Sequence, residues 1–299
     1  MIQSLAGRQL DGLPLDNISV LRLDQLGGAA PGNKSFKLRL HLRRAQARGV
    51  TRILSFGGGW SNHLHALAAV GSELGLQTIG VVRGGDTDTA MLEDVRRWGM
   101  QLVPVSREDY RRRDQADYQR QLAARFGPCL VIPEGGAGSA GLLGSRAIAD
   151  LARVPWQWSR VVVAVGSGTT LAGLAAGLEN ARELVGISAL KGASDLESRV
   201  TAMLAGAGQQ ARLPWHIDHD WHCGGFARAD ERLRQFIPAF AAATGIPLEP
   251  VYTGKLFLAL YHKLASGEWR ADEPLLAIHS GGLQGRRGYA WLTTTDVAD

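Results

Sequence analysis

The chain has 299 residues, of which 45% are hydrophobic and 20% charged, the balance of a globular protein with a large core. Its formal net charge is +5, but the basic residues are dispersed and interleave with no aromatic stripe, which argues against nucleic acid as a partner. Two cysteines give neither a disulfide framework nor metal-ligand spacing, and the longest apolar runs are too short for a membrane span. With no apolar signal region at the start, we expect a cytoplasmic protein without a metal site.

Short β-rich runs alternate with longer helical patterns, which is typical of parallel sheets flanked by helices. The predicted strands, in chain order, are Ile53–Phe56, Thr78–Val82, Gln101–Val105, Cys129–Pro133, Val161–Val165, Leu184–Leu190 and Leu275–His279. The predicted helices between and around them are Phe36–Arg48, Asn62–Gly75, Ala90–Trp98, Arg112–Phe126, Leu142–Arg153, Leu171–Asn180 and Arg228–Ala243. The densest basic run, Arg111–Arg113, is interpreted as part of a solvated surface.

Glycine-rich segments mark the candidate sites, because ligands of such folds bind in the loops after the carboxyl ends of strands. They are Pro31–Ser35 (PGNKS), Phe56–His63 (FGGGWSNH), Pro133–Gly141 (PEGGAGSAG), Val165–Thr170 (VGSGTT) and His279–Gly282 (HSGG).

The segment Val165–Thr170 is a candidate phosphate site. It joins an apolar strand to a helical pattern, so that adjacent backbone amides and three hydroxyl side chains gather at a helix N-terminus. It matches neither a Walker loop nor GxGxxG. A plain tight turn is the alternative, and the hydroxyls favour phosphate.

Lys34 is a candidate for covalent attachment of an aldehyde cofactor. The chain has only five lysines, and an amine can lose its proton where arginine cannot. At a helix start, in a pocket that excludes water, the charged form of an amine is disfavoured, and a neutral amine can form a Schiff base. Taken alone, a surface lysine at a helix start is the commoner interpretation.

Ser61 admits two interpretations. In a nucleophile elbow the pattern would be G-x-S-x-G, but His63 stands where the last small residue belongs. Ser61 and Asn62 are also good helix N-caps. One hypothesis is therefore an α/β-hydrolase, with partners such as Asp220 and His279, and the other is a loop that holds a cofactor.

The order of these motifs carries a resemblance. GNKxxKL, GGxxSNH, PxGG, GSGTTxAG, PVYTGK and HxGG follow one another between about Val20 and Tyr289. This series resembles the 1-aminocyclopropane-1-carboxylate deaminase/D-cysteine desulfhydrase family, which consists of pyridoxal-phosphate enzymes of the tryptophan-synthase-β type.

The resemblance implies a pyridoxal 5'-phosphate site. Lys34 matches the lysine that holds the cofactor, and Asn62 the residue that hydrogen-bonds its ring hydroxyl. Ser280 matches the hydroxyl that faces the pyridine nitrogen, with Thr253 as a second candidate. The residues that match the phosphate cup are Gly166, Ser167, Gly168, Thr169 and Thr170.

Catalytic and substrate-binding residues are implied in the same way. Lys34, Ser61 and Tyr252 are expected to be catalytic, with Ser61 a nucleophile, a proton carrier or a carboxylate anchor. The expected substrate-binding residues are Trp60, Ser61, Asn62, His63, Phe226 and Tyr252.

Some positions depart from the family's pattern. Cyclopropane ring opening goes with a glutamate after the tyrosine and with a second tyrosine, but Thr253 and Phe226 stand there. Both residues argue against cyclopropane ring opening. Thr253 matches the desulfhydrase pattern, from which Phe226 departs as well. The resemblance implies β-elimination from a small amino acid, as in D-cysteine desulfhydrase, giving a keto acid and ammonia. The alternatives are 1-aminocyclopropane-1-carboxylate deaminase, or a homologue that binds the cofactor with another or no turnover. Trp60 also replaces a smaller polar residue.

The resemblance also implies an architecture. We expect an α/β fold with two domains, a large one of residues 1–35 and 140–299 that binds the cofactor and a small inserted one of residues 36–139. Each would hold a twisted, mainly parallel sheet with flanking helices, and the cofactor would lie between them. A homodimer is expected from the resemblance alone.

Overall fold

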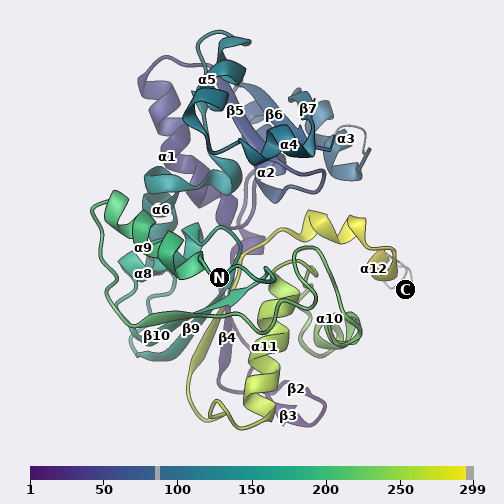
Figure 1. Cartoon of the computed structure of the whole chain (residues 1–299). Coiled ribbons are helices and arrows are strands. Elements are labelled where there is room, and N and C mark those ends of the chain that lie inside the picture. Colours follow the sequence, from purple (N-terminus) through teal and green to yellow (C-terminus); the bar gives the residue numbers. More distant parts are fainter. Residues whose placement is uncertain (85–87, 294–299) are drawn as a thin grey trace.

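The strands of the protein form two main sheets, which lie one above the other in Figure 1. The computed structural model describes residues 1–84 and 88–293. The larger sheet has the order β1–β4–β12–β9–β10–β11, and β1 alone among these strands runs antiparallel to its neighbour. Its strands are β1 (Ile2–Ser4), β4 (Ile18–Arg22), β12 (Leu275–His279), β9 (Trp158–Val165), β10 (Ala181–Ser188) and β11 (Trp215–Asp218).

The smaller sheet is parallel throughout, in the order β7–β6–β5–β8. Its strands are β5 (Arg52–Gly57), β6 (Gln77–Arg83), β7 (Gln101–Val105) and β8 (Leu130–Val131). A short antiparallel hairpin, β2 (Gln9–Leu10) and β3 (Leu13–Pro14), lies at the opposite end of the molecule in Figure 1.

Helices surround both sheets. Those drawn with the smaller sheet in Figure 1 are α1 (Asn33–Ala47), α2 (Asn62–Glu73), α3 (Ala90–Arg97), α4 (Arg107–Arg111) and α5 (Ala116–Ala124). The others are α6 (Gly138–Arg146), α7 (Ile148–Leu151), α8 (Thr169–Gly177), α9 (Leu196–Gly206), α10 (Glu231–Thr244), α11 (Thr253–Ala265) and α12 (Ala290–Thr293). Within residues 1–84 and 88–293 there are also three 3-10 helices, η1 (Leu23–Gln25), η2 (Glu134–Gly136) and η3 (Leu283–Gly288).

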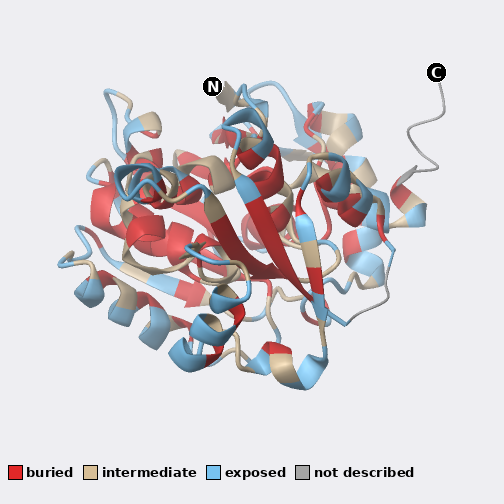
Figure 2. Cartoon of the chain, turned by 90° about the horizontal axis from the view of Figure 1, so that it is seen from above, coloured by how far each residue is buried: buried red, intermediate tan, exposed pale blue. Residues whose placement is uncertain are grey.

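Burial explains why the central segments are so apolar. The central strands are largely red in Figure 2. β9 has buried residues on both of its faces, and its sequence WSRVVVAV is mainly apolar. Every residue of α8 is buried, and its glycines allow close approach to the neighbouring helices. A Cβ on Gly173 would lie 2.5 Å from the Ser145 Cβ, and one on Gly177 would lie 2.8 Å from the Ala149 Cβ.

The predicted α/β class with mainly parallel sheets is confirmed. The helix predicted at Arg112–Phe126 is present as α5, but it begins four residues later, because residues 112–114 form a turn after α4, a short helix that was not predicted. The helix predicted at Leu142–Arg153 is divided into α6 and α7, which begin at Gly138 and Ile148.

Two elements that position the site were not predicted. β4 is short, and most of α11 is buried, so its sequence TGKLFLALYHKLA shows no clear polar stripe. None of the helices within the described ranges is long and apolar enough to cross a bilayer. The division into domains at residues 35/36 and 139/140 stays a prediction.

Candidate active site

The loop before α1 is fixed against the loop that follows β12. Gly32 forms a β-bridge with Gly281, and the Asn33 N–H donates to the Ser280 carbonyl at 3.0 Å. Gly32 has a φ of 104°, and a Cβ there would lie 2.6 Å from the same carbonyl. Glycine is therefore required, and Lys34 is held beside Ser280.

Lys34 lies partly buried in the first turn of α1. Its Nζ donates to the Asn33 Oδ1 at 2.9 Å, and the Asn33 Nδ2 donates to the Thr170 Oγ1 at 3.0 Å. Asn33 thus connects the lysine with the glycine-rich loop before α8. Burial lowers the pKa of Lys34 to about 8, against the opposing attraction of the Glu249 carboxylate. The amine is therefore half neutral near pH 8.

Two further lysines are buried nearby in the fold. Lys37 lies one turn beyond Lys34, and burial together with the Lys34 charge lowers its pKa well below the ordinary value. Burial lowers the pKa of Lys255 to about 8, but its Nζ donates to the carbonyls of Ala189 and Gly225 at 3.2 and 2.7 Å. Lys255 therefore holds two loops together.

The loop between β9 and α8 gathers hydrogen-bond donors. The hydroxyls of Ser167 and Thr169 lie 3.0 Å apart, and Gly168, with a φ of 82°, precedes the free amides of α8. A Cβ on Gly166 would lie 2.9 Å from the Tyr252 ring. The loop has the small residues, hydroxyls and helix N-terminus that suit a phosphate group, and Tyr252 covers its first residue.

The Tyr252 phenol stays protonated at neutral pH. Its pKa is raised by burial first, and then by the charges of Glu249 and Glu134. The Phe226 ring meets it edge-on, with ring centroids 6.1 Å apart and planes at 68°. The aromatic ring beside the Tyr252 phenol is therefore that of a phenylalanine, which has no hydroxyl.

Glu249 was not predicted as a site residue, and it orders the start of α11. Its buried carboxylate accepts hydrogen bonds from the backbone N–H groups of Val251, Tyr252 and Thr253 at 2.6 to 2.8 Å. The Thr253 hydroxyl is engaged with the same residue. Burial raises the pKa of Glu249 while these hydrogen bonds lower it. The only indication of this role in the sequence is that a glutamate stands four residues before Thr253.

Asn62 lies at the start of α2, against the loop after β12. Its Oδ1 accepts from the Gln284 Nε2 at 2.6 Å. A Cβ on Gly282 would lie 2.6 Å from the Asn62 Nδ2. Asn62 and Ser280, far apart in the sequence, therefore come from loops that touch.

Ser61 is the N-cap of α2, as one of its two interpretations predicted. Its Oγ accepts a hydrogen bond from the Leu64 N–H at 3.2 Å. Gly57 leaves room for this side chain, because a Cβ at position 57 would lie 2.5 Å from the Ser61 Oγ. The buried His63 ring hydrogen-bonds the Ser55 Oγ at 2.8 Å instead. Within the described residues no histidine pairs with Ser61, so the nucleophile and base of a hydrolase are not assembled.

Ser280 has a rigid support behind it. The imidazole of His279 hydrogen-bonds the Pro247 carbonyl at 2.8 Å and pairs with Asp24 at 3.1 Å, and Arg22 also pairs with Asp24. The side chains of Arg22, Asp24 and His279 are each at most 5% exposed. Of the two candidates for the pyridine nitrogen, Thr253 is committed to Glu249, so we expect Ser280 to fill that role.

The structure thus brings together the loops of most predicted site residues. Lys34, Asn62, Ser280, Tyr252 and the loop Gly166–Thr170 are connected by the contacts above. Trp60 packs on Gly288 and is 38% exposed, and Phe226 is 51% exposed, so both are open to solvent. The ring of His63 is enclosed, and its role in substrate binding stays a prediction. The residues that the sequence did not reveal are Asn33, Glu249 and Gln284.

Comparison with known proteins gives the family. The model of the family described as "Pyridoxal-phosphate dependent enzyme" matches residues 12–281. A D-cysteine desulfhydrase of Salmonella paratyphi A is 31% identical over 293 residues, covering 92% of this chain and 89% of the relative. A putative 1-aminocyclopropane-1-carboxylate deaminase of Thermotoga maritima is 31% identical over 284 residues, covering 90% and 89%.

Solved structures agree on the fold. A crystal structure of an ACC deaminase homologue has a TM-score of 0.82 at 25% identity, and covers 98% of this chain and 93% of that one. The structure of an O-ureido-L-serine synthase has a TM-score of 0.68 at 15% identity, covering 100% and 94%, and at that identity it supports the fold alone.

Proposed function

The chain belongs to the pyridoxal-phosphate-dependent enzymes, in the group of 1-aminocyclopropane-1-carboxylate deaminase and D-cysteine desulfhydrase, and we propose that it is a lyase that eliminates the β-substituent of a small amino acid. The observation that carries the proposal is Lys34, an amine with a pKa lowered to about 8, joined through Asn33 to the loop that suits a phosphate. The nearest chemistry is that of the relatives named D-cysteine desulfhydrase.

The residues fit pyridoxal phosphate. The loop Gly166–Thr170 offers amides and hydroxyls to the phosphate group, and the Ser280 hydroxyl is not committed to another of the described residues. Asn62 has its Nδ2 left to donate, because Gln284 occupies its Oδ1. Lys34 is the amine that would hold the aldehyde carbon.

Lys34 is the residue that we assign to proton transfer. When bound, the cofactor supplies the electron sink that allows an amino acid to lose its α-proton. The neutral Lys34 amine accepts that proton, because burial lowers its pKa to about 8 and so raises the neutral fraction. The protonated Tyr252 phenol donates a hydrogen bond to the departing group, and Ser61 lies on the N-terminus of α2, which favours a substrate carboxylate. For cysteine, the overall reaction consumes one water and releases hydrogen sulfide, ammonia and pyruvate.

Cyclopropane ring opening is less well supported. The ring of Phe226 contacts Tyr252 where a second phenol would be needed, and Phe226 can neither donate nor accept a proton. The Thr253 hydroxyl, in the place of the glutamate, is bound to Glu249. Neither residue can supply the proton transfer that ring opening requires.

The test is turnover by the cofactor-loaded enzyme. D-Cysteine, L-cysteine, D-serine and 1-aminocyclopropane-1-carboxylate are each incubated with the protein and with Lys34→Ala. We expect keto acid and ammonia in equal amounts from a substrate with a β-leaving group, and none in the variant. A 2-oxo acid formed from the cyclopropane amino acid alone would favour the deaminase. A loaded protein that releases keto acid from no amino acid would contradict the proposal and indicate a homologue without turnover.

A further inference from the structure

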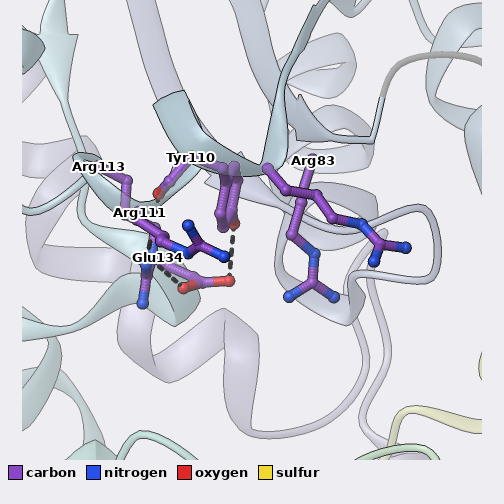
Figure 3. Close-up of a pocket in the computed structure, with 6 residues that line it drawn as sticks. Arg83, Tyr110, Arg111, Arg113 and Glu134 are labelled. Atoms are coloured by element: carbon purple, nitrogen blue, oxygen red, sulfur yellow. Dashed lines mark hydrogen bonds and ion pairs between the residues drawn. The ribbon is translucent and has the colours of Figure 1, made fainter.

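A polar cavity of about 370 Å³ lies beside the candidate active site. Figure 3 shows its lining, which we call the arginine pocket: Arg83, Arg107, Tyr110, Arg111, Arg113 and Glu134. Arg83 ends β6, three of the others belong to α4, and Glu134 begins η2. The sequence predicted only a solvated surface for the run that includes Arg111 and Arg113. A volume of this size lies in the range of small-molecule sites.

Tyr110 and Glu134 form a fixed part of this pocket. The buried Tyr110 donates its hydroxyl to the Glu134 Oε1 at 2.7 Å, and the Arg113 Nε donates to the Glu134 Oε2. The guanidinium carbons of Arg113 and Arg83 lie 5.2 and 5.8 Å from the Tyr110 ring centroid. The only carboxylate of the lining is therefore already paired with Arg113.

The other guanidinium groups of the lining have no ion-pair partner among the residues that the structure describes. Across residues 1–84 and 88–293, no carboxylate lies within ion-pair distance of Arg83, Arg107 or Arg111. Arginines elsewhere on the surface do have such partners, as Arg199 has Asp195 and Arg270 has Asp272. Arg83, Arg107 and Arg111 are exposed, and positive charges that line one cavity repel one another. An anion that accepts hydrogen bonds from several of them relieves that repulsion.

The arginine pocket adjoins the loops of the active site on two sides. A Cβ on Gly58, in the loop that carries Ser61, would lie 3.7 Å from the Arg83 Nη2. A Cβ on Gly135, the residue after Glu134, would lie 3.6 Å from the Ser167 Oγ. An anion in the pocket would therefore be next to the loops that we expect to hold substrate and cofactor.

We propose that the arginine pocket binds an acidic group at the far end of the substrate's side chain, so that the preferred substrate is an amino acid with a phosphate or carboxylate beyond the β-carbon. The inference rests on the proposed function, because it assumes that an amino acid occupies the loops beside the pocket. It deepens that function by naming the substrate class. The bond broken is unchanged, and the arginines supply binding and orientation.

The test compares acidic and neutral amino acids of similar shape. Absorption of the bound cofactor gives dissociation constants for serine and O-phosphoserine, and for S-methylcysteine and S-carboxymethylcysteine, in both chiralities and without any need for turnover. The variants are Arg83→Gln and Arg111→Gln, and the matched control is Arg120→Gln, an exposed arginine of α5 outside the pocket. We expect an acidic ligand to bind at least tenfold more tightly than its neutral partner. Each pocket variant should remove most of that preference and leave the neutral ligands within twofold, and the control should change neither.

The outcomes distinguish recognition of an acidic substrate from binding of free anions. The phosphate pair and the carboxylate pair show which acid the pocket prefers. Equal binding of acidic and neutral ligands, or a preference that survives both pocket variants, would overturn the inference and leave β-elimination standing. Calorimetry with inorganic phosphate covers the case in which no amino acid perturbs the cofactor. Phosphate binding that Arg83→Gln abolishes, without any preference for acidic amino acids, would assign the pocket to free anions and contradict a role in substrate recognition.

Discussion

Gly166→Ala should displace Tyr252 and so test whether this contact shapes the active site. The new Cβ would lie 2.9 Å from the Tyr252 Cε1 and 3.1 Å from its hydroxyl oxygen, closer than ordinary van der Waals contact. Overpacking of this kind costs about 1–3 kcal/mol. The loss of backbone freedom in the unfolded chain offsets about 0.4–1 kcal/mol of that cost, because Gly166 does not have a positive φ. We expect a net destabilisation of about 1–2 kcal/mol.

Urea unfolding of the cofactor-free protein measures the free energy, and titration with pyridoxal phosphate measures its affinity. We expect the cofactor to bind at least tenfold more weakly, because the ring and the loop that suits a phosphate cannot both keep their positions. Gly206→Ala is the matched control, since a Cβ there meets nothing within 4 Å and Gly206 ends a helix. Wild-type stability and cofactor affinity in Gly166→Ala would refute this account of the loop.

Three further predictions concern proton transfer. The activity should rise with pH through an acidic limb near 8, because the Lys34 pKa is lowered to about 8 and only the neutral amine accepts a proton; a flat profile from pH 6 to 9 would contradict this. In Glu249→Gln the acidic limb should move to lower pH, since the Glu249 carboxylate raises the pKa of Lys34; an unmoved limb would refute this coupling between the two residues. The free energy of unfolding in urea should also fall by about 1–3 kcal/mol, because the buried N–H groups lose their charged acceptor. Tyr252→Phe should lower kcat by about 10²- to 10⁴-fold, the usual contribution of a general acid, and a kcat within threefold of wild type would exclude that role.

The sequence predicted the class of fold and the loops that meet, for physical reasons that are visible in particular residues. Val161–Val165 is apolar because β9 is covered on both faces, and Ser61 caps α2 as its residue type favours. Gly32 and Gly166 stand where a Cβ would meet another loop, so the glycine clusters did mark close approaches.

What the sequence could not reveal depends on tertiary contacts. Glu249 acts on the backbone of α11, a helix that has no clear polar stripe because most of it is buried. Arg111 belongs to a run that is also typical of a solvated surface, and only the fold places it near Arg83 and Glu134. Such sites are made by residues from distant segments, and no spacing in the chain records them.

The proposed chemistry depends on which lysine holds the cofactor, and this lysine can be identified directly. Borohydride reduction of the loaded enzyme fixes the pyridoxyl group on its lysine, and peptide mass spectrometry identifies that residue among the five lysines of the chain. We expect the label on Lys34 alone. A label on Lys37 or Lys255, the other buried amines with lowered pKa values, would contradict it, because the amine beside the loop Gly166–Thr170 would then not be the one that carries the chemistry.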